Sequence, residues 1–238
     1  MTESEQVLYE KIDERIALIT LNRPEKKNAI TLKMAQLIQR YLHQAETDET
    51  VRVIVLTGCQ SVFSAGMDIH AFRKGELPIV EPEGFGGLIH ACLNKPIIAA
   101  IDGIAYGGGF ELALSCDLII ASRNSTFRFP ETGIGLVAAQ GGCARLPYRI
   151  SPYIALDWLL TGRVFHAEEA LRYGAISRIS ESNVLSEALE IASQIGEKDT
   201  AATQAVKNII HHGLIHNEAE NFEHQKTWVD IIRRSAVK

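Results

Sequence analysis

Short apolar runs separated by polar turns fill the first half of the chain. Residues 7–12 and 15–21 flank the polar pair Asp13-Glu14 and predict a β-hairpin. Four further runs have the length and apolar content that are typical of strands: residues 51–57, 96–101, 118–121 and 126–129. Because strand, turn and helix patterns alternate here, we expect crossover connections rather than a string of hairpins.

Two helices are expected in the first half: Thr31 predicts the N-cap of one, and residues 88–93 predict a second, short one. Helical spacing dominates the second half. Five later segments repeat apolar positions at helical intervals: residues 151–160, 167–173, 184–195, 200–212 and 218–234. Glycines mark the ends of most of them, at Gly162, Gly174, Gly196 and Gly213. The pattern therefore predicts a helical appendage after a mixed first half.

A glycine-rich turn followed by a carboxylate is the strongest chemical signal. Gly107, Gly108 and Gly109 follow the strand run 96–101, and the apolar residues after them predict a helix that opens at this turn. N–H groups at a helix start lack intrahelical partners, so the turn can hold negative charge beside Glu111. This pair suits a site where an anion forms transiently while a proton moves. The alternative is a structural turn in which Glu111 complements the helix dipole.

A second turn of small residues precedes Asp68. Ala65 and Gly66 come soon after the strand run 51–57 and again place bare backbone N–H groups after a strand. Asp68 is either a helix cap or a catalytic acid, and its position favours the cap.

Two polar loops are candidates for ligand contacts. Residues 73–84 contain prolines and several charges, which predict a mobile surface loop or a lid. Arg23, Lys26 and Lys27 lie in the loop 22–29 and are candidates for phosphate contacts. A solvated loop is the commoner reason for such a basic cluster.

Composition argues against several classes of protein. The net charge of −5 over 238 residues gives no support to a nucleic-acid or anionic-membrane surface. Residues 1–6 show no signal-peptide pattern, and no apolar run approaches membrane-spanning length. The four cysteines are dispersed, which favours reduced thiols in a cytoplasmic protein. His211, His212 and His216 are interrupted by Gly213, so we expect a surface cluster rather than a metal site.

Three segments in this order resemble the crotonase (enoyl-CoA hydratase/isomerase) superfamily: residues 63–68, 107–113 and 129–131. Two more extend the resemblance over nearly the entire chain: residues 161–163 and 167–171. Details of the sequence are most similar to members that act on crotonobetainyl-CoA, namely residues 83–88, 107–114 and 145–147.

The resemblance implies an α/β fold. Residues 1–195 would form a spiral of stacked ββα units, and residues 196–238 a C-terminal helical region used in trimerisation. It also implies a homotrimer or a homohexamer built as a dimer of trimers. The substrate would be an acyl-CoA thioester, with no metal and no separate cofactor, because CoA is part of the substrate.

The same resemblance implies the site. The thioester oxygen would accept hydrogen bonds from the backbone N–H groups of Met67 and Gly108, an oxyanion hole. Glu111 and Glu131 match the two family glutamates, and the presence of both favours reversible hydration of a 2-enoyl-CoA. Four neighbours are expected to bind substrate: Ala65, Gly66, Asp68 and Ile69.

The chain departs from the family pattern in three places. Residues 138–142 read Ala-Ala-Gln-Gly-Gly instead of Pro-Gly-x-Gly-Gly, which changes the wall beside the acyl group. His70-Ala71 stands where a lysine is common, and the sequence ends at Lys238, before the usual last helix. Two alternatives to a hydratase stay open. One is a Δ3,Δ2-enoyl-CoA isomerase that uses one glutamate, and the other, which the early end favours, is an inactive paralogue that binds CoA or forms oligomers.

Overall fold

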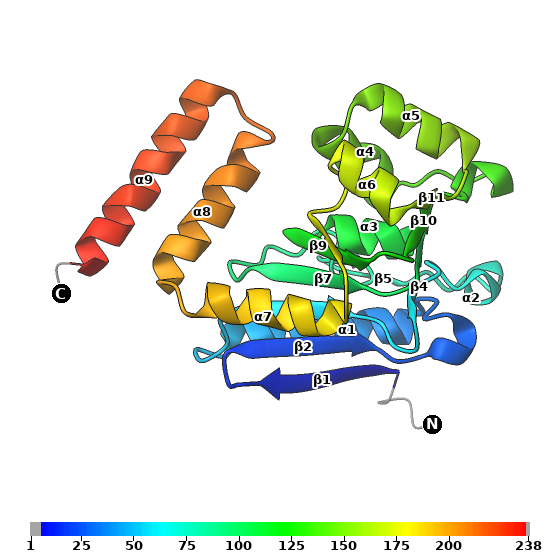
Figure 1. Ribbon diagram of the computed structural model, residues 1–238, viewed down its shortest axis with the longest axis horizontal. Helices are drawn as coiled ribbons and strands as arrows, with labels where there is room; N and C mark the ends of the chain where they lie inside the picture. Colours follow the sequence, from blue (N-terminus) through cyan, green and yellow to red (C-terminus); the bar gives the residue numbers. More distant parts are fainter. Residues whose placement is uncertain (1–5, 237–238) are drawn as a thin grey trace.

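A six-stranded sheet forms the base of the protein, whose computed structural model describes residues 6–236 (Figure 1). Residues 1–5, which include most of the segment where no signal-peptide pattern was found, and residues 237–238 lie outside this part. The strands, in spatial order, are β1 (Val7–Ile12), β2 (Ile16–Leu21), β3 (Val53–Thr57), β7 (Ile97–Ile101), β9 (Leu118–Ser122) and β12 (Arg178–Ser180). The hairpin β1–β2 is antiparallel and every other neighbouring pair is parallel, so the expected crossovers are confirmed.

A smaller four-stranded sheet lies beside the first. Its spatial order is β11 (Phe165–His166), β10 (Thr126–Arg128), β8 (Ile104–Tyr106) and β4 (Val62–Ser64). Each of β4, β8 and β10 follows a strand of the large sheet after a tight turn, which gives the stacked ββα units that the resemblance implied. At one such turn Gly103 has a φ of 77°, and a Cβ there would overlap the carbonyl of Ser61.

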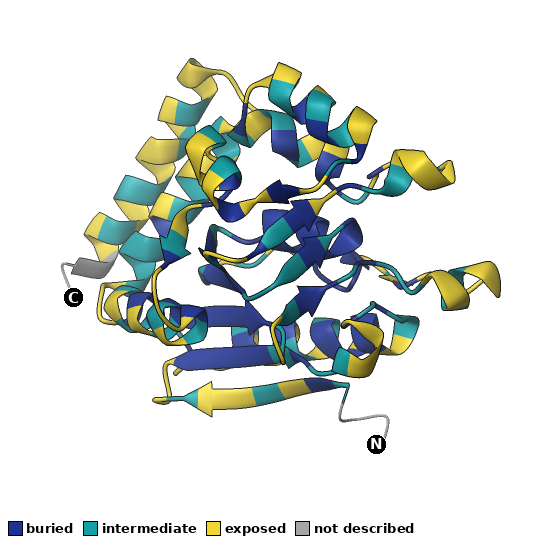
Figure 2. Ribbon diagram, turned by 45° about the vertical axis from the view of Figure 1, so that its right-hand side comes forward, coloured by how far each residue is buried: buried dark blue, intermediate teal, exposed yellow. Residues whose placement is uncertain are grey.

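Side chains alternate between the two faces of the large sheet. Ile54 and Leu56 face a core shared with α1 (Leu32–Thr47), whereas Val53 and Val55 face α7 (Val184–Gly196). Thr31 caps α1 as predicted, because its Oγ1 accepts a hydrogen bond from the Met34 N–H at 3.2 Å. Burial is concentrated in the inner strands of the two sheets and in the short helix that follows β8, whereas in the edge strand β1 only Val7 is buried (Figure 2).

The remaining helices are α2 (Ile69–Arg73), α3 (Gly108–Leu114), α4 (Gly142–Arg149), α5 (Pro152–Thr161), α6 (Ala167–Tyr173), α8 (Thr200–Gly213) and α9 (Glu218–Ala236). The five helices expected in the second half are confirmed. The prediction of a helix at residues 88–93 is wrong. Residues 86–90 form successive turns instead, because Gly86 and Gly87 adopt left-handed conformations. α4 was not expected because Pro147 lies inside it.

The last two helices form an antiparallel hairpin that stands away from the sheets (Figure 1). Asp117, next to β9, joins α8 to the core through the Nζ atom of Lys207 at 3.0 Å and the Nε2 atom of His211 at 2.9 Å. The division at residues 195 and 196 stays a prediction. Among the described helices, none combines the length and apolar character that crossing a membrane requires.

Candidate active site

The glycine turn lies at the start of α3, as expected, but it follows β8 rather than the longer strand β7. Gly107 has a φ of 50°, and a Cβ on it would lie 2.6 Å from Oε1 of Glu131. A Cβ on Gly108 would lie 2.5 Å from Cζ of Phe85. A side chain at either position would therefore displace groups at the turn: the carboxyl of Glu131 in the case of Gly107, and the ring of Phe85 in the case of Gly108.

The turn at residues 65–68 is held by hydrogen bonds to the loop before α1. The Ile30 N–H donates to Gly66 O at 2.7 Å, and the Asp68 N–H donates to Ile30 O at 3.0 Å. These two bonds fix the backbone on both sides of Met67 in an extended conformation. The N–H of Met67 itself therefore stays available on the other side of the chain.

The two turns face each other. A Cβ placed on Gly66 would lie 2.9 Å from the backbone nitrogen of Gly108. Within residues 6–236, no hydrogen bond engages the N–H groups of Met67 and Gly108. The arrangement leaves two backbone donors beside one space, which is what an oxyanion needs.

Glu111 lies one turn further along α3 and is almost completely buried. Its Oε1 atom accepts hydrogen bonds from the N–H groups of Gln140 at 2.8 Å and Gly142 at 2.9 Å. Burial raises the pKa of this carboxyl to about 7; the two backbone donors oppose the shift, and the charge of Glu131 adds to it. At neutral pH the group can therefore either accept or release a proton.

Glu131 begins a short 3₁₀ turn, Glu131–Ile134, directly after Pro130. Burial raises the pKa of its carboxyl as well. Its Oε2 atom is buried and has no hydrogen-bond partner among the described residues. An unpaired buried acceptor is costly, and such atoms are common where a ligand supplies the partner.

A cavity of about 410 Å³ brings most of the expected site residues together. The expected residues that line it are Ala65, Met67, Ile69, Gly108, Glu111 and Glu131. Gly66 packs behind this wall against Gly108, and Asp68 is turned away from the cavity.

Asp68 acts as a helix cap. Its Oδ1 atom accepts from the N–H groups of His70 and Ala71, both at 3.0 Å, at the start of α2. Its Oδ2 atom accepts from Nη1 of Arg23 at 2.7 Å. Arg23 is thus held by an internal ion pair, whereas Lys26 and Lys27 are exposed.

Residues 73–84, expected to form a mobile surface loop or a lid, include most of a short hairpin that ends at Phe85. Its strands are β5 (Ile79–Val80) and β6 (Gly84–Phe85). Glu83 ties it to α1 through Gln39 and through Nε2 of His43 at 2.6 Å. The hairpin supplies Phe85 to the cavity, from the segment 83–88 that carries part of the family resemblance.

Cysteine and histidine side chains form no competing site. Burial, with the charge of Asp117, raises the pKa of Cys116 to about 12, which disfavours a thiolate. His212 stacks on His216 with ring centroids 3.7 Å apart, so the rings lie parallel instead of converging on one point. Over residues 6–236, no group of three His, Cys, Asp or Glu side chains has a metal-binding arrangement.

Comparisons with known proteins agree on one family. A family model described as enoyl-CoA hydratase/isomerase matches residues 11–235. A carnitinyl-CoA dehydratase from Proteus mirabilis is 42% identical over 196 residues, which cover 80% of this chain and 75% of that protein. The crystal structure of an enoyl-CoA hydratase from Mycobacterium tuberculosis superimposes on this chain with a TM-score of 0.90 and 39% sequence identity. The superposition covers 94% of this chain and 88% of the other. An enoyl-CoA hydratase from Mycobacterium marinum is 37% identical with a TM-score of 0.92, at 97% and 91% coverage.

Proposed function

The chain belongs to the enoyl-CoA hydratase/isomerase family, and from this premise we propose that it catalyses the reversible hydration of a 2-enoyl-CoA thioester. The family resemblance that the sequence motifs indicated is thereby confirmed. The observation that carries the proposal is the pair Glu111 and Glu131, two carboxyls with raised pKa values that line one cavity beside two unbonded backbone donors.

The two donors would stabilise the intermediate. Addition of water to a double bond conjugated with a thioester moves negative charge onto the thioester oxygen and gives an enolate. In the proposed mechanism the N–H groups of Met67 and Gly108 both donate to that oxygen. Removing one such preorganised donor typically costs about 3–4 kcal/mol of transition-state stabilisation.

The two glutamates would divide the proton transfers. The oxygen of water bonds to the β-carbon while its proton passes to a carboxylate, and a proton is delivered to the α-carbon from a carboxylic acid. Mutual repulsion disfavours simultaneous ionisation of Glu111 and Glu131, which supports one charged and one neutral carboxyl at neutral pH. Either glutamate can start in either state, because the reaction runs in both directions.

A crotonobetainyl acyl group is the specific substrate that the sequence details favour. The name of the Proteus relative supports it, since that protein is a carnitinyl-CoA dehydratase. A quaternary ammonium binds best against an aromatic face or a carboxylate, and Phe85 lines the cavity.

The isomerase alternative is separated from hydration by Glu131. An isomerase moves one proton between the α- and γ-carbons and needs one carboxyl group. Glu131→Gln should abolish hydration of crotonyl-CoA, because hydration uses both carboxyls. An isomerase that uses the other carboxyl alone would keep its 3-enoyl-CoA isomerisation in the same variant. Full hydratase activity in this variant would overturn the two-glutamate mechanism.

The assembly and location complete the proposal. A homotrimer, or a homohexamer of two trimers, is supported by apolar side chains that lie exposed on the last two helices and on the turn between them, among them Ile210, Ile215 and Phe222. We include no cofactor, because both proton transfers use side chains of the chain itself. A cytoplasmic location is supported by the four cysteines, which are free in the structure.

A further inference from the structure

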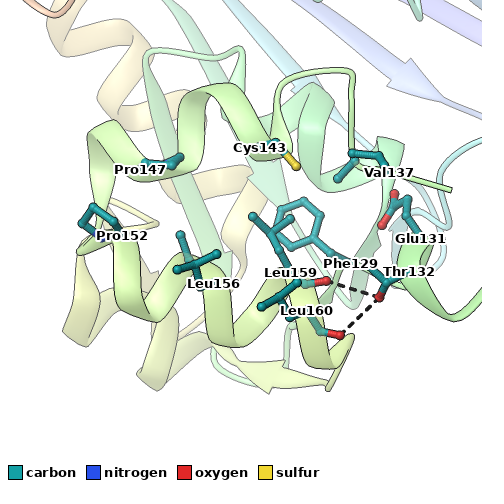
Figure 3. A pocket seen from close by; sticks show the side chains of 12 residues that line it. Phe129, Glu131, Thr132, Val137, Cys143, Pro147, Pro152, Leu156, Leu159 and Leu160 are labelled. Carbon is teal, nitrogen blue, oxygen red and sulfur yellow. Dashed lines mark hydrogen bonds between the residues drawn. The ribbon is translucent and has the colours of Figure 1, made fainter.

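Helix α4 presents two different faces to the rest of the protein. Cys143 and Pro147 line a second cavity, of about 420 Å³, which lies between α4, α5 and the segment that carries Glu131 (Figure 3). Arg145 and Arg149 lie about half a turn away from them on the helix, and their guanidinium groups bond to the end of α3. Nothing in the proposed hydration chemistry uses these two arginines.

Arg145 reaches Glu111 through the end of α3. Its Nη1 atom donates a hydrogen bond to Oγ of Ser115 at 3.2 Å. The hydroxyl of Ser115 in turn donates to the backbone carbonyl of Glu111 at 3.0 Å. One side chain therefore separates the guanidinium from the backbone that carries the carboxyl of Glu111.

Arg145 also lies against the loop that supplies both donors to this carboxyl. The N–H groups of Gln140 and Gly142 bond to Oε1 of Glu111. Gly141 lies between them in the chain, and a Cβ placed on it would lie 2.7 Å from Nη1 of Arg145. The guanidinium therefore packs directly against the segment that holds the two donors in place.

A third contact joins Arg145 to the oxyanion turn. Its Nη2 atom donates to the carbonyl of Ile89. Ile89 lies in the successive turns that follow Phe85, whose ring packs on Gly108. Arg145 thus contacts the three segments that carry Glu111, the donors of its carboxyl and the ring against Gly108.

The charge of Arg145 has no carboxylate partner of its own. Within residues 6–236 the acceptors of its guanidinium are a hydroxyl and a carbonyl, both neutral. Burial raises the pKa of Glu111 to about 7, and the nearby cation of Arg145 opposes that shift. The other titratable and charged groups around Glu111 and Arg145 are Glu131, Cys116, Cys143 and Arg149.

We propose that Arg145 is a positioning residue for hydration, which holds Glu111, the donors of its carboxyl and the ring against the oxyanion turn in one arrangement. The inference rests on the proposed function, because Glu111 transfers a proton there. Arg145 does not line the catalytic cavity, so it acts through these contacts and not on the substrate. Changes at Arg145 should therefore lower kcat and leave KM nearly unchanged.

Two variants separate the charge of Arg145 from its shape. Arg145→Gln removes the charge, whereas Arg145→Lys keeps the charge but lacks the planar group that bonds in two directions. For crotonyl-CoA, kcat should fall about a hundredfold in Arg145→Gln and about tenfold in Arg145→Lys. KM should change less than about threefold in either variant, because the substrate contacts are retained.

The ionisation of Glu111 provides a readout that does not depend on turnover. Carbon-13 NMR of protein with labelled glutamate follows each carboxyl, and the resonance of Glu111 is identified by its absence in Glu111→Gln. The pKa of this carboxyl should be higher by about 1 in Arg145→Gln, because a cation that favours the ionised form is lost. It should stay close to the parent value in Arg145→Lys.

Arg149→Gln is the matched control. Arg149 lies on the same face of α4 and donates to the carbonyls of Leu114 at 3.1 Å and Cys116 at 2.7 Å, so its loss also weakens the junction with α3. The thermal midpoint of this variant should fall. The pKa of Glu111 should nevertheless equal that of the parent protein.

Two results would overturn the inference. One is a folded Arg145→Gln in which kcat and the pKa of Glu111 match the parent. The other is an equal rise of this pKa in Arg149→Gln, which would mean that any weakening of the junction has the same effect. If Arg145→Gln does not fold, an unchanged kcat in Arg145→Lys would contradict the need for the guanidinium. A raised pKa of Glu111 in Arg145→Gln, when the parent hydrates no 2-enoyl-CoA, would support the placement of Arg145 and reject the proposed reaction, so the two failures are distinguishable.

Discussion

Oε1 of Glu131 lies 2.6 Å from the position that a Cβ atom on Gly107 would occupy. The absence of a side chain on Gly107 therefore sets where the carboxyl of Glu131 can lie. Gly107→Ala should lower kcat at least tenfold by displacing this carboxyl. It should also cost roughly 1–3 kcal/mol of folding stability, because φ is 50° at this residue.

Gly133→Ala is the matched control for this change. Gly133 lies two residues after Glu131, has no positive φ, and has no atom within 4 Å of the position of an added Cβ. We expect kcat and the thermal midpoint to stay close to those of the parent protein. Equal losses in Gly107→Ala and Gly133→Ala would contradict the steric argument.

Glu111 should make the protein less stable as the pH rises. Its pKa is about 7 in the folded protein against 4.5 as the ordinary value, so the folded state binds the extra proton between these values. The preference of the folded state for this proton contributes about 3 kcal/mol to the free energy of unfolding. The contribution is fully present below about pH 4.5 and is lost as the pH rises through 7.

Glu111→Gln tests that linkage. The amide oxygen can still accept from Gln140 and Gly142 but does not ionise, so the variant should be more stable than the parent at pH 8 and should lose most of this advantage at pH 5. Thermal unfolding at both pH values measures the difference. A variant that is less stable than the parent at pH 8 would show that the ionised carboxylate does not destabilise the folded protein.

Asp68 provides a test of capping against catalysis. Asp68→Asn keeps an acceptor for the N–H groups of α2 and loses the ion pair with Arg23, so most of kcat should be retained. Asp68→Ala loses the cap as well and should cost about 1 kcal/mol more in stability. A drop in kcat of a hundredfold or more in Asp68→Asn, with the fold intact, would instead indicate an acid in the reaction.

Glu83 should affect the reaction without touching the substrate. It ties the hairpin β5–β6 to α1, and the hairpin presses Phe85 against Gly108. Glu83→Ala should lower kcat about tenfold with a smaller change in KM, because a displaced ring disturbs the oxyanion turn. Glu81→Ala, at an exposed position in the same hairpin, serves as the control in steady-state kinetics and should match the parent.

Residue type explains which parts of this site were predictable. Glycines and acids carry chemistry in their identity, so the glycine turn and Glu111 could be singled out from the sequence, and the family resemblance added Glu131. The structure brings Gly108, Glu111 and Glu131 to one cavity, and their individual roles stay predictions. The donors to Glu111 are backbone N–H groups of Gln140 and Gly142, which every residue type except proline possesses. Only the folded chain reveals which N–H groups meet the carboxylate.

Element length explains what was predictable in the fold. The long strands and the capped helices carry a full period of their pattern, and they were found. β4, β8, β11 and β12 span two or three residues and lie in no longer alternating run, so they were not recognised. β10 is as short, but it lies in the alternating run 126–129. The turns at residues 86–90 depend on left-handed glycines and on packing between α1 and α3, so the local apolar spacing there misleadingly predicted a helix.

The measurement that tests the central claim most directly is the loss of conjugated-thioester absorbance when the protein is mixed with crotonyl-CoA, and in parallel with crotonobetainyl-CoA. Hydration predicts that the absorbance falls with the parent protein and that Glu111→Gln and Glu131→Gln slow this fall by about a hundredfold or more. Calorimetry on the same samples reports binding. Binding of the thioesters with unchanged absorbance for both would contradict the proposed reaction and would indicate a protein of this family that binds acyl-CoA without hydrating it.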